Sequence, residues 1–228
     1  MNILPVRTRR FLRNLVGYGG LVCVCFAHAQ PDETQVLKQP QEGGYVAQIA
    51  YAPSYNASDR NIISQPPQQT KLAKTEFVYK NGYQLTLLDN FAIHARVLSR
   101  RIYLGDPRAD IAPVDMAVGW GKMSDQDIIQ HINFKQNRRF LFWHVDEFPL
   151  PRKELEASAS NLHLIPADGA IERQIKSATK GQIVSMSGYL VDVKAPDDFV
   201  WATSRSREDS GDGACEILLV TDIKIKPL

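Results

Sequence analysis

The sequence predicts a domain of the α+β class, built on a small twisted antiparallel sheet or a partly open β-barrel with a few short helices. Three observations predict it. Apolar and polar residues alternate on both sides of the Asn81-Gly82 dipeptide, segments 182–193, 199–203 and 216–225 have the composition of strands, and helical spacing recurs only in short stretches. Asn-Gly is a dipeptide that strongly favours a two-residue hairpin turn.

The first 29 residues predict a secretory signal peptide. Four arginines precede a short, mostly apolar run over 15–26, which ends in Ala27-His28-Ala29. A basic segment, an apolar segment and a small-residue cleavage site are typical of general secretory export. We therefore expect a periplasmic or secreted protein that has no transmembrane span after cleavage. The alternative is that this segment remains as an uncleaved anchor.

Removing the signal changes both the charge and the cysteine count. The whole chain of 228 residues has a net charge of +2 and three cysteines. Residues 30–228 hold 23 basic and 25 acidic residues, a net charge of −2, with Cys215 as their single cysteine. This charge gives no argument for binding nucleic acid.

Residues 30–72 predict a disordered, flexible linker. Gln, Pro and Gly are frequent there, and neither a helical nor a strand period holds. Such a composition buries too little apolar area to offset the chain entropy. We expect three parts: a signal peptide over 1–29, a Pro/Gln-rich linker over 30–72, and a single α+β domain over 73–228.

The strands of this domain are predicted in order. Alternating Phe77 and Tyr79 lead into the Asn-Gly turn, and the same period continues on its far side to about residue 104, although a helix over 91–103 also fits. The aromatic run 139–145 predicts a further strand. Gly188 inside the strand 182–193 indicates a bulge or a bend.

Three short helices are predicted between the strands. Ser124 begins a capping box, Pro151 can start a helix over 152–159, and Asp168 can cap a helix that ends near Gly181. Ile171, Ile175 and Ala178 recur at helical spacing within the last of them.

Two aromatic segments are candidate ligand-binding sites. Trp120 lies between two glycines, an arrangement that can present the indole as a stacking platform. Arg138 and Arg139 precede an aromatic run that contains Trp143, a combination found on surfaces that bind single-stranded nucleic acid or anionic glycans. The structural alternatives are that Trp120 fills the core and that the arginines protect a solvated sheet edge.

Cys215, His163 and Asp115 are candidate catalytic residues. Cys215 follows a Gly-Asp-Gly turn where a loop enters a strand, a place that suits an exposed nucleophile, and a neutral imidazole such as that of His163 can act as a base. The order His163 then Cys215 invites comparison with sortase-type transpeptidases, but these need an arginine after the cysteine, and none follows Cys215. An inert thiol and a core histidine are the structural alternative. No cofactor or metal is predicted, because the histidines lack close ligand spacing.

Four segments of the chain resemble a known group of proteins. The segments are Pro113-x-Asp115-x-x-x-Gly119-Trp120-Gly121-x-Met123-Ser124-Asp125, Asn161-x-His163-Leu164-Ile165-Pro166-Ala167, Gly188-Tyr189-Leu190-Val191 and Gly211-Asp212-Gly213-Ala214-Cys215-Glu216. They are similar to a family of small exported or membrane-tethered bacterial proteins of unassigned function. The resemblance covers residues 85–225, implies a bacterial source, and assigns no catalytic role.

Together these observations favour an exported binding or accessory module of the cell envelope, without catalysis, whose partner is an envelope protein or a glycan. One alternative is a thiol hydrolase or transpeptidase that uses Cys215 and His163. A second is an extracytoplasmic domain that binds nucleic acid or an anionic glycan, of which nucleic acid is the less favoured partner.

Overall fold

The computed structural model of the protein describes residues 62–206, 209 and 213–226. The predicted signal peptide, and the predicted linker as far as residue 61, lie outside the described residues. Within these ranges the chain forms nine strands, three α-helices and one 3₁₀ helix. In chain order they are β1 (Gln68–Lys80), β2 (Tyr83–Ile102), β3 (Val114–Gly119), η1 (Gly121–Ser124), α1 (Gln126–Ile129), β4 (Asn133–Asn137), β5 (Phe140–His144), α2 (Arg152–Glu156), β6 (Ala159–Pro166), α3 (Gly169–Ser177), β7 (Ile183–Lys194), β8 (Val200–Trp201) and β9 (Glu216–Lys226).

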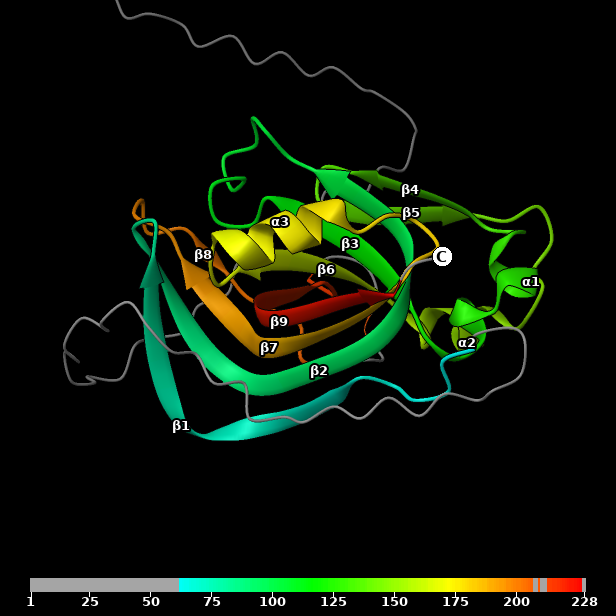
Figure 1. The fold of residues 1–228 in the computed structure, drawn as a ribbon, viewed down its shortest axis with the longest axis horizontal. Helices are drawn as coiled ribbons and strands as arrows, with labels where there is room; N and C mark the ends of the chain where they lie inside the picture. The colour runs from blue at the N-terminus through cyan, green and yellow to red at the C-terminus, as the bar shows by residue number, and fades with distance from the viewer. Residues whose placement is uncertain (1–61, 207–208, 210–212, 227–228) are drawn as a thin grey trace, which may run out of the picture. The chain divides into compact units, whose positions relative to one another are not determined.

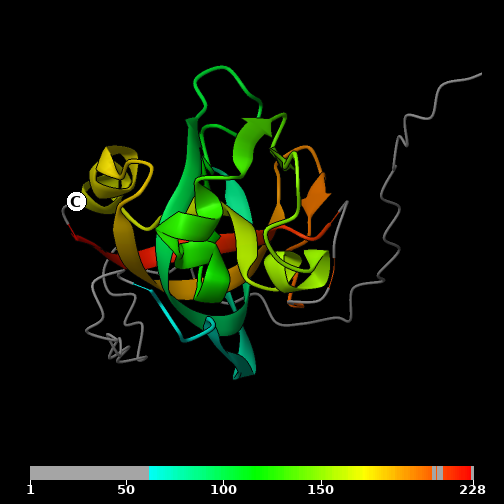
Figure 2. The ribbon, with the colours of Figure 1, turned by 90° about the vertical axis from the view of Figure 1, so that its right-hand side faces the viewer.

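Seven of these strands form one twisted sheet, in the order β1-β2-β3-β6-β9-β7-β8, with a further pairing of β2 to β7. The long strand β2 bends through the fold (Figure 1). Its first part pairs with β1 and β7, and its last part, from Arg96 to Ile102, pairs with β3. Strands β4 and β5 form a separate hairpin, which lies with α1 and α2 at one end of the sheet (Figures 1 and 2).

The α+β class is confirmed at the level of a mostly β structure with a few short helices. One detail of the predicted sheet is wrong: strands β6 and β9 are parallel, so the sheet is mixed rather than antiparallel. The sheet curls through the pairing of β2 with β7 and is not closed as a barrel.

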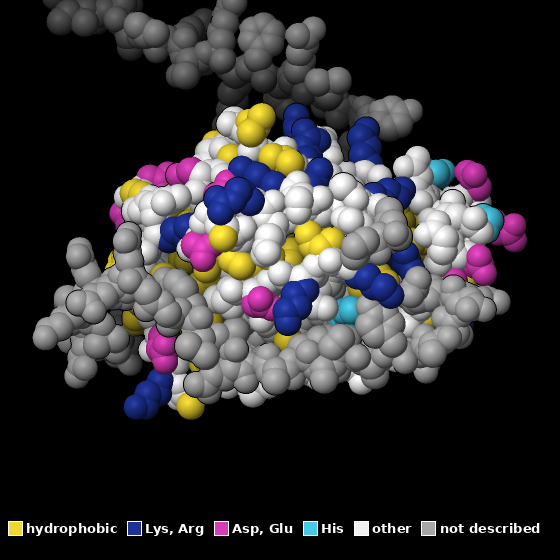
Figure 3. Space-filling view, in the orientation of Figure 1, with side chains coloured by type: hydrophobic (Ala, Val, Ile, Leu, Met, Phe, Trp, Pro, Cys, Tyr) yellow, Lys and Arg dark blue, Asp and Glu magenta, His cyan; other side chains and the backbone are white. Residues whose placement is uncertain are grey.

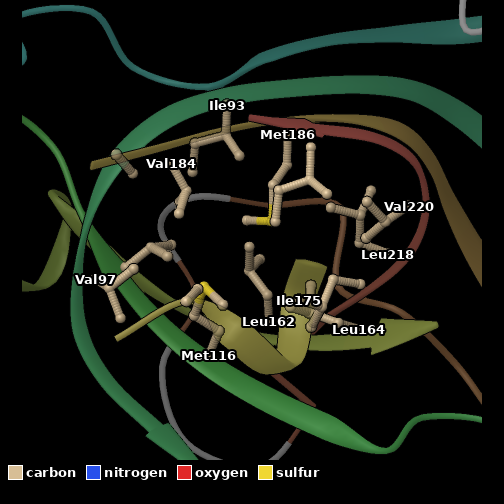
Figure 4. Close-up of a cluster of buried hydrophobic side chains, with 14 of the residues drawn as sticks. Ile93, Val97, Met116, Leu162, Leu164, Ile175, Val184, Met186, Leu218 and Val220 are labelled. Carbon is tan, nitrogen blue, oxygen red and sulfur yellow. The ribbon is translucent and has the colours of Figure 1, made fainter. Parts of the chain in front are cut away.

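The inward side chains of the sheet form the main core (Figure 4). Period-two alternation sends one face of each strand toward this core. The side chains labelled in Figure 4 come from β2, β3, β6, β7, β9 and α3: Ile93, Val97, Met116, Leu162, Leu164, Ile175, Val184, Met186, Leu218 and Val220. Ile175 shows why α3 packs there, because Ile171 and Ile175 lie one helical turn apart and both are buried.

The outer face of β3 and β6 is covered too. A second cluster beneath α1 and α2 contains Leu98, Ala117, Met123 and Leu155, with Trp143 of the hairpin packed against it. Polar residues on this outer face are therefore buried although they do not point into the main core.

Most predicted elements are confirmed, with shifted ends. The Asn-Gly hairpin forms between β1 and β2, the segment 91–103 is strand, and Asp168 caps α3 by accepting hydrogen bonds from Ala170 N and Ile171 N. Helix α3 ends at Ser177 rather than near Gly181, and the helix predicted over 152–159 ends at Glu156, since the chain enters β6 at Ala159.

The predicted linker boundary at residue 72 is too late. Strand β1 begins at Gln68, and Ile63 is buried in the main core. Ser124 attaches the segment around Ile63 to the domain. Its hydroxyl accepts a hydrogen bond from Ile63 N at 2.8 Å and donates one to Gly121 O at 2.7 Å. Ser124 is therefore not the predicted helix cap, and Asp125 caps α1 instead.

Among the residues that the structure describes, no helix combines the length and apolarity needed to cross a membrane.

Gly188 marks a bulge, as predicted, and it supplies a test of the fold. The register between β7 and β9 shifts at this residue, where φ is +159° and an added Cβ would lie 1.8 Å from Leu219 O. Gly188→Ala is expected to lower the free energy of unfolding by at least about 2 kcal/mol, because backbone must move to admit the methyl group. Urea denaturation measures this.

Gly105→Ala is the matched control. An added Cβ at Gly105 meets nothing within 4 Å, so its effect should stay within about 0.5 kcal/mol. Equal unfolding midpoints for the two variants would contradict the bulge.

Candidate active site

A carboxylate and an imidazole meet on the outer face of the sheet. Asp115 of β3 and His163 of β6 are directly opposite partners in the antiparallel register. Because their neighbours along each strand point into the main core, both side chains point to the other face. His163 Nδ1 lies 2.8 Å from Asp115 Oδ1. Two residues 48 positions apart in the chain thus form one hydrogen-bonded pair.

Cys215 joins this pair at the start of β9. The parallel register sets Leu162 of β6 opposite Glu216 of β9, so Cys215 lies beside Asn161. Asn161 Nδ2 is 3.6 Å from Cys215 Sγ, and Cys215 is close enough to the His163 imidazole to raise its pKa. The three candidate catalytic residues therefore converge as a chain Asp115–His163–Cys215.

The histidine of this chain holds its proton strongly. His163 is 3% exposed and Asp115 is fully buried. Burial by itself lowers the pKa of a histidine, but the hydrogen bond and negative charge of Asp115, with a further contribution from Cys215, outweigh it and raise the pKa of His163 to about 9. At neutral pH the imidazole is therefore a buried cation between a carboxylate and a thiol.

Arg139 completes the charge cluster from the β4–β5 hairpin. Its Nη1 lies 2.9 Å from Asp115 Oδ1, and its Nη2 lies 2.7 Å from Asp106 Oδ1. Burial opposes the charged form, yet the two carboxylates raise the pKa of Arg139. The Tyr103 ring lies 3.8 Å from the guanidinium carbon, and burial together with the Asp115 charge raises the pKa of Tyr103 to about 12.

The hairpin turn that carries Arg139 is strained. Arg138 and Arg139 form the two-residue turn, with φ of 49° and 71°. Asn and Gly normally occupy such positions because a Cβ is disfavoured at positive φ. Asn161 holds the turn in place: its Nδ2 donates to Arg139 O at 3.0 Å, and its Oδ1 accepts from Gln136 Nε2 at 2.8 Å. Strain of this kind gathers at functional sites.

The indole of Trp201 packs against the His163 imidazole. The ring centroids of His163 and Trp201 are 4.5 Å apart, and the indole also lies 5.9 Å from the Arg139 guanidinium carbon. The indole excludes water from His163. Sequence reasoning missed Trp201, because nothing in the short segment 199–203 indicates which strand it pairs with.

An ion pair anchors the segment that leads to Cys215. Arg205 Nε and Nη2 each lie 2.6 Å from one oxygen of the buried Asp89 of β2. Despite its burial, this pairing lowers the pKa of Asp89. Ser204 N then donates to Cys215 O at 3.0 Å, which ties the two ends of the loop together. The loop that leads into β9 is thus held at both ends, while 207–208 and 210–212 lie outside the described residues.

A pocket of about 260 Å³ opens beside the thiol, between the hairpin and β6. Cys215 is partly buried and lines it. The other lining residues are Met123, Phe134, Phe140, Leu141, Phe142, Trp143, Leu155, Glu156, Ala159, Ser160, Asn161 and Ala214. Most of these lining residues are apolar, and Cys215, the candidate nucleophile, is one of them.

The predicted ligand-binding residues separate into two groups. Trp120 is 5% exposed within the main core, and Arg139 is 7% exposed, so neither lies on the surface as expected. Arg138 is exposed, and Trp143 is half-buried in the wall of the pocket. On the face shown in Figure 3, Lys and Arg side chains are dispersed among other residue types. The residues predicted to form one basic and aromatic surface therefore do not lie together on one face.

Comparison with protein-family models, with curated proteins and with solved structures finds no match to this chain.

The charge cluster predicts a specific dependence of stability on pH. The folded-state pKa of His163, about 9, exceeds the unfolded value of about 6.5, so its contribution is complete below pH 6.5 and disappears as the pH rises through 9. This contribution is roughly 3 kcal/mol. Urea unfolding of the wild type between pH 6 and 10 should therefore show a loss of stability that His163→Gln lacks.

His144→Gln is the matched control, because the side chain of His144 is 79% exposed; this variant should follow the wild-type curve. Parallel curves for the wild type and His163→Gln would contradict the raised pKa. The pH dependence of the His163 imidazole resonances in NMR gives an independent midpoint.

Proposed function

We propose that the protein is a cysteine-dependent acyl-transfer enzyme, a thiol hydrolase or transpeptidase. Cys215 is the nucleophile, His163 the acid and base, and Asp115 the residue that orients the imidazole. One observation carries this proposal: β3, β6 and the residue before β9 bring a carboxylate, an imidazole and a thiol together, with the carboxylate hydrogen-bonded to the imidazole. Such a triad is recognised by geometry and roles, not by the order of its residues in the sequence.

The charges of the site suit a cysteine nucleophile. Thiolate is the reactive form of cysteine, and a protonated imidazole beside sulfur favours it. The raised pKa of His163 keeps this proton on the imidazole, where Asp115 stabilises it. Arg139 also holds Asp115 in position, because its Nη1 contacts the same carboxylate oxygen as His163.

The proposed reaction proceeds in two balanced steps. Cys215 Sγ attacks a carbonyl carbon and forms a C–S bond, and the leaving amine, alcohol or thiol departs with the proton from His163. A thioester remains on Cys215. Water, or an acceptor amine, then attacks the thioester carbonyl and gives its proton to His163 as the C–S bond breaks. The thiolate and the imidazolium are thereby restored.

Asn161 is placed to assist this reaction. Its Nδ2 approaches the sulfur at 3.6 Å while the rest of its amide is held by Gln136 and by Arg139 O. A carbonyl attacked by Cys215 Sγ would bring its oxygen toward this donor. A fixed N–H aimed at developing negative charge lowers the barrier to acyl transfer. Asn161 thus contacts both Cys215 and the hairpin.

The order of the strands supports, by analogy, a ligand site on the face of β3 and β6. The pairing order of β2, β3, β6, β9 and β7, with α3 between β6 and β7, is that of oligonucleotide- and oligosaccharide-binding sheets. Those partly open barrels bind ligands on the face of their second and third strands and at the adjoining loops. Here β3 and β6 correspond to those strands and carry Asp115 and His163. This likeness concerns position and says nothing about the chemistry.

The other expectations remain predictions. A binding module without catalysis stays a candidate, but two residues chosen for its contact face, Trp120 and Arg139, are buried. Export to the bacterial envelope rests on residues 1–29, which lie outside the described residues.

Selective alkylation tests the proposal. In the folded protein at pH 7, iodoacetamide should label Cys215 rapidly, and His163→Gln should slow this labelling by at least about 10-fold, because it removes the cation beside the sulfur. Peptide mass spectrometry must assign the label, since Cys23 and Cys25 also carry thiols. His144→Gln should leave the rate unchanged.

Labelling that requires denaturation, or a rate that is insensitive to His163, would overturn the proposal. Asp115→Asn tests the orienting role separately. It should slow labelling less than His163→Gln does, because the imidazole remains but loses its anionic partner.

A further inference from the structure

We infer that the acyl group accepted by Cys215 is apolar, and that it occupies the pocket between the β4–β5 hairpin and β6. This inference rests on the proposed function and adds the substrate class to it. It depends on three properties of the pocket: its position beside the sulfur, the composition of its wall, and the pairing of its polar groups.

The hairpin turns an apolar face toward the nucleophile. Side chains alternate along β4 and β5, and Phe134 of β4 is the cross-strand partner of Trp143 of β5. Phe134, Leu141 and Trp143 are half-buried, pack against the cluster under α1 and α2, and line the pocket. A partly exposed apolar wall in a concave site is the usual surface for an apolar ligand.

The polar groups in the wall are already paired. Ser160 Oγ donates to Glu216 Oε2, and Glu156 Oε1 accepts from Arg152 Nε at 2.7 Å. The Asn161 amide is held by Gln136 and by Arg139 O, which leaves only its approach to the sulfur. No Lys, Arg or His stands among the described residues that line this pocket. An anionic acyl group would lose its hydration there and gain no cationic partner.

A small residue of β6 lines the pocket. Ala159 lies two and four positions before Asn161 and His163 in β6, so all three share one face of the strand. A larger side chain at position 159 would extend from that face toward the pocket. Ala159 is therefore the position at which a substitution can fill the pocket.

A pair of alkylating reagents tests the inference without needing the natural substrate. N-hexyl-iodoacetamide carries a six-carbon apolar chain on the same reactive group as iodoacetamide. For Cys215 in the folded full chain, the hexyl reagent should react at least about 10-fold faster than iodoacetamide, since each methylene in a fitted apolar pocket adds selectivity. Peptide mapping again assigns the label.

Two variants locate the preference. Ala159→Leu should abolish the hexyl preference while the rate with iodoacetamide stays within about two-fold of the wild type, because the filled pocket leaves the thiol accessible. Trp143→Ala should reduce the preference by removing a wall. Phe199→Ala is the matched aromatic control, because Phe199 is 41% exposed and lines a different pocket. It should leave the preference unchanged.

The outcomes separate the two proposals. If Cys215 fails to react in the native protein, the proposed function fails. If Cys215 reacts quickly and depends on His163 but shows no hexyl preference, the catalytic proposal stands and the apolar substrate class is wrong. A preference that survives both Ala159→Leu and Trp143→Ala would also overturn the assignment to this pocket. If Ala159→Leu disturbs the small-reagent rate, the Trp143→Ala result decides.

The source of the acyl group is distinguished by two ester substrates. p-Nitrophenyl hexanoate presents a fatty acyl chain, and N-acetyl-phenylalanine p-nitrophenyl ester presents an apolar amino acid. Faster turnover of hexanoate than of p-nitrophenyl acetate supports an acyl-lipid source, and faster turnover of the phenylalanine ester supports a peptide source. Turnover of acetate faster than both would contradict the inference.

Discussion

The structure of this site depends on the buried carboxylate of Asp115. Its Oδ1 receives both the His163 imidazole, at 2.8 Å, and the Arg139 guanidinium, at 2.9 Å. With the partly exposed Asp106, two carboxylates balance two cations. Removing one partner from such a cluster leaves an unpaired buried charge, which costs about 3–5 kcal/mol. Asp115 thereby joins β3, β6 and the β4–β5 hairpin.

Contacts within this cluster stabilise the strained turn of the β4–β5 hairpin. Non-glycine residues at positive φ are unfavourable, and Arg138 and Arg139 occupy both central positions of its turn. The ion pairs of Arg139 and the hydrogen bond from Asn161 to its carbonyl oxygen offset that strain. In return, the hairpin covers the outer face of β6 and supplies the apolar wall beside Cys215. The β4–β5 hairpin thus forms one wall of the pocket beside Cys215.

The catalytic candidates themselves lie on rigid strands or directly at a strand end. Asp115 and His163 are fixed by register, and Cys215 precedes β9, while Arg205 and Asp89 anchor the loop that leads to it. Placement on strands holds reactive groups more tightly than placement on free loops. Buried polar networks are expensive in stability, so a network of this extent, next to an apolar pocket and a thiol, supports a functional role rather than a structural one alone.

The sequence by itself determined the local features: the Asn-Gly hairpin, the Asp168 cap and the bulge at Gly188. Turn chemistry, capping and period-two alternation act over a few residues, so they are readable without the fold. Polar Asp115 and His163 each lie between apolar residues, which is compatible with a strand that has one buried and one exposed face. The pattern does not show that other elements bury both faces. Only the tertiary structure decided that Trp120 and Arg139 point inward, that β6 and β9 run parallel, and that Asp115, His163 and Cys215 meet. The physical reason is that strand register is set by pairing between distant segments and by which surfaces bury each other, and neither is encoded in the neighbours of a residue.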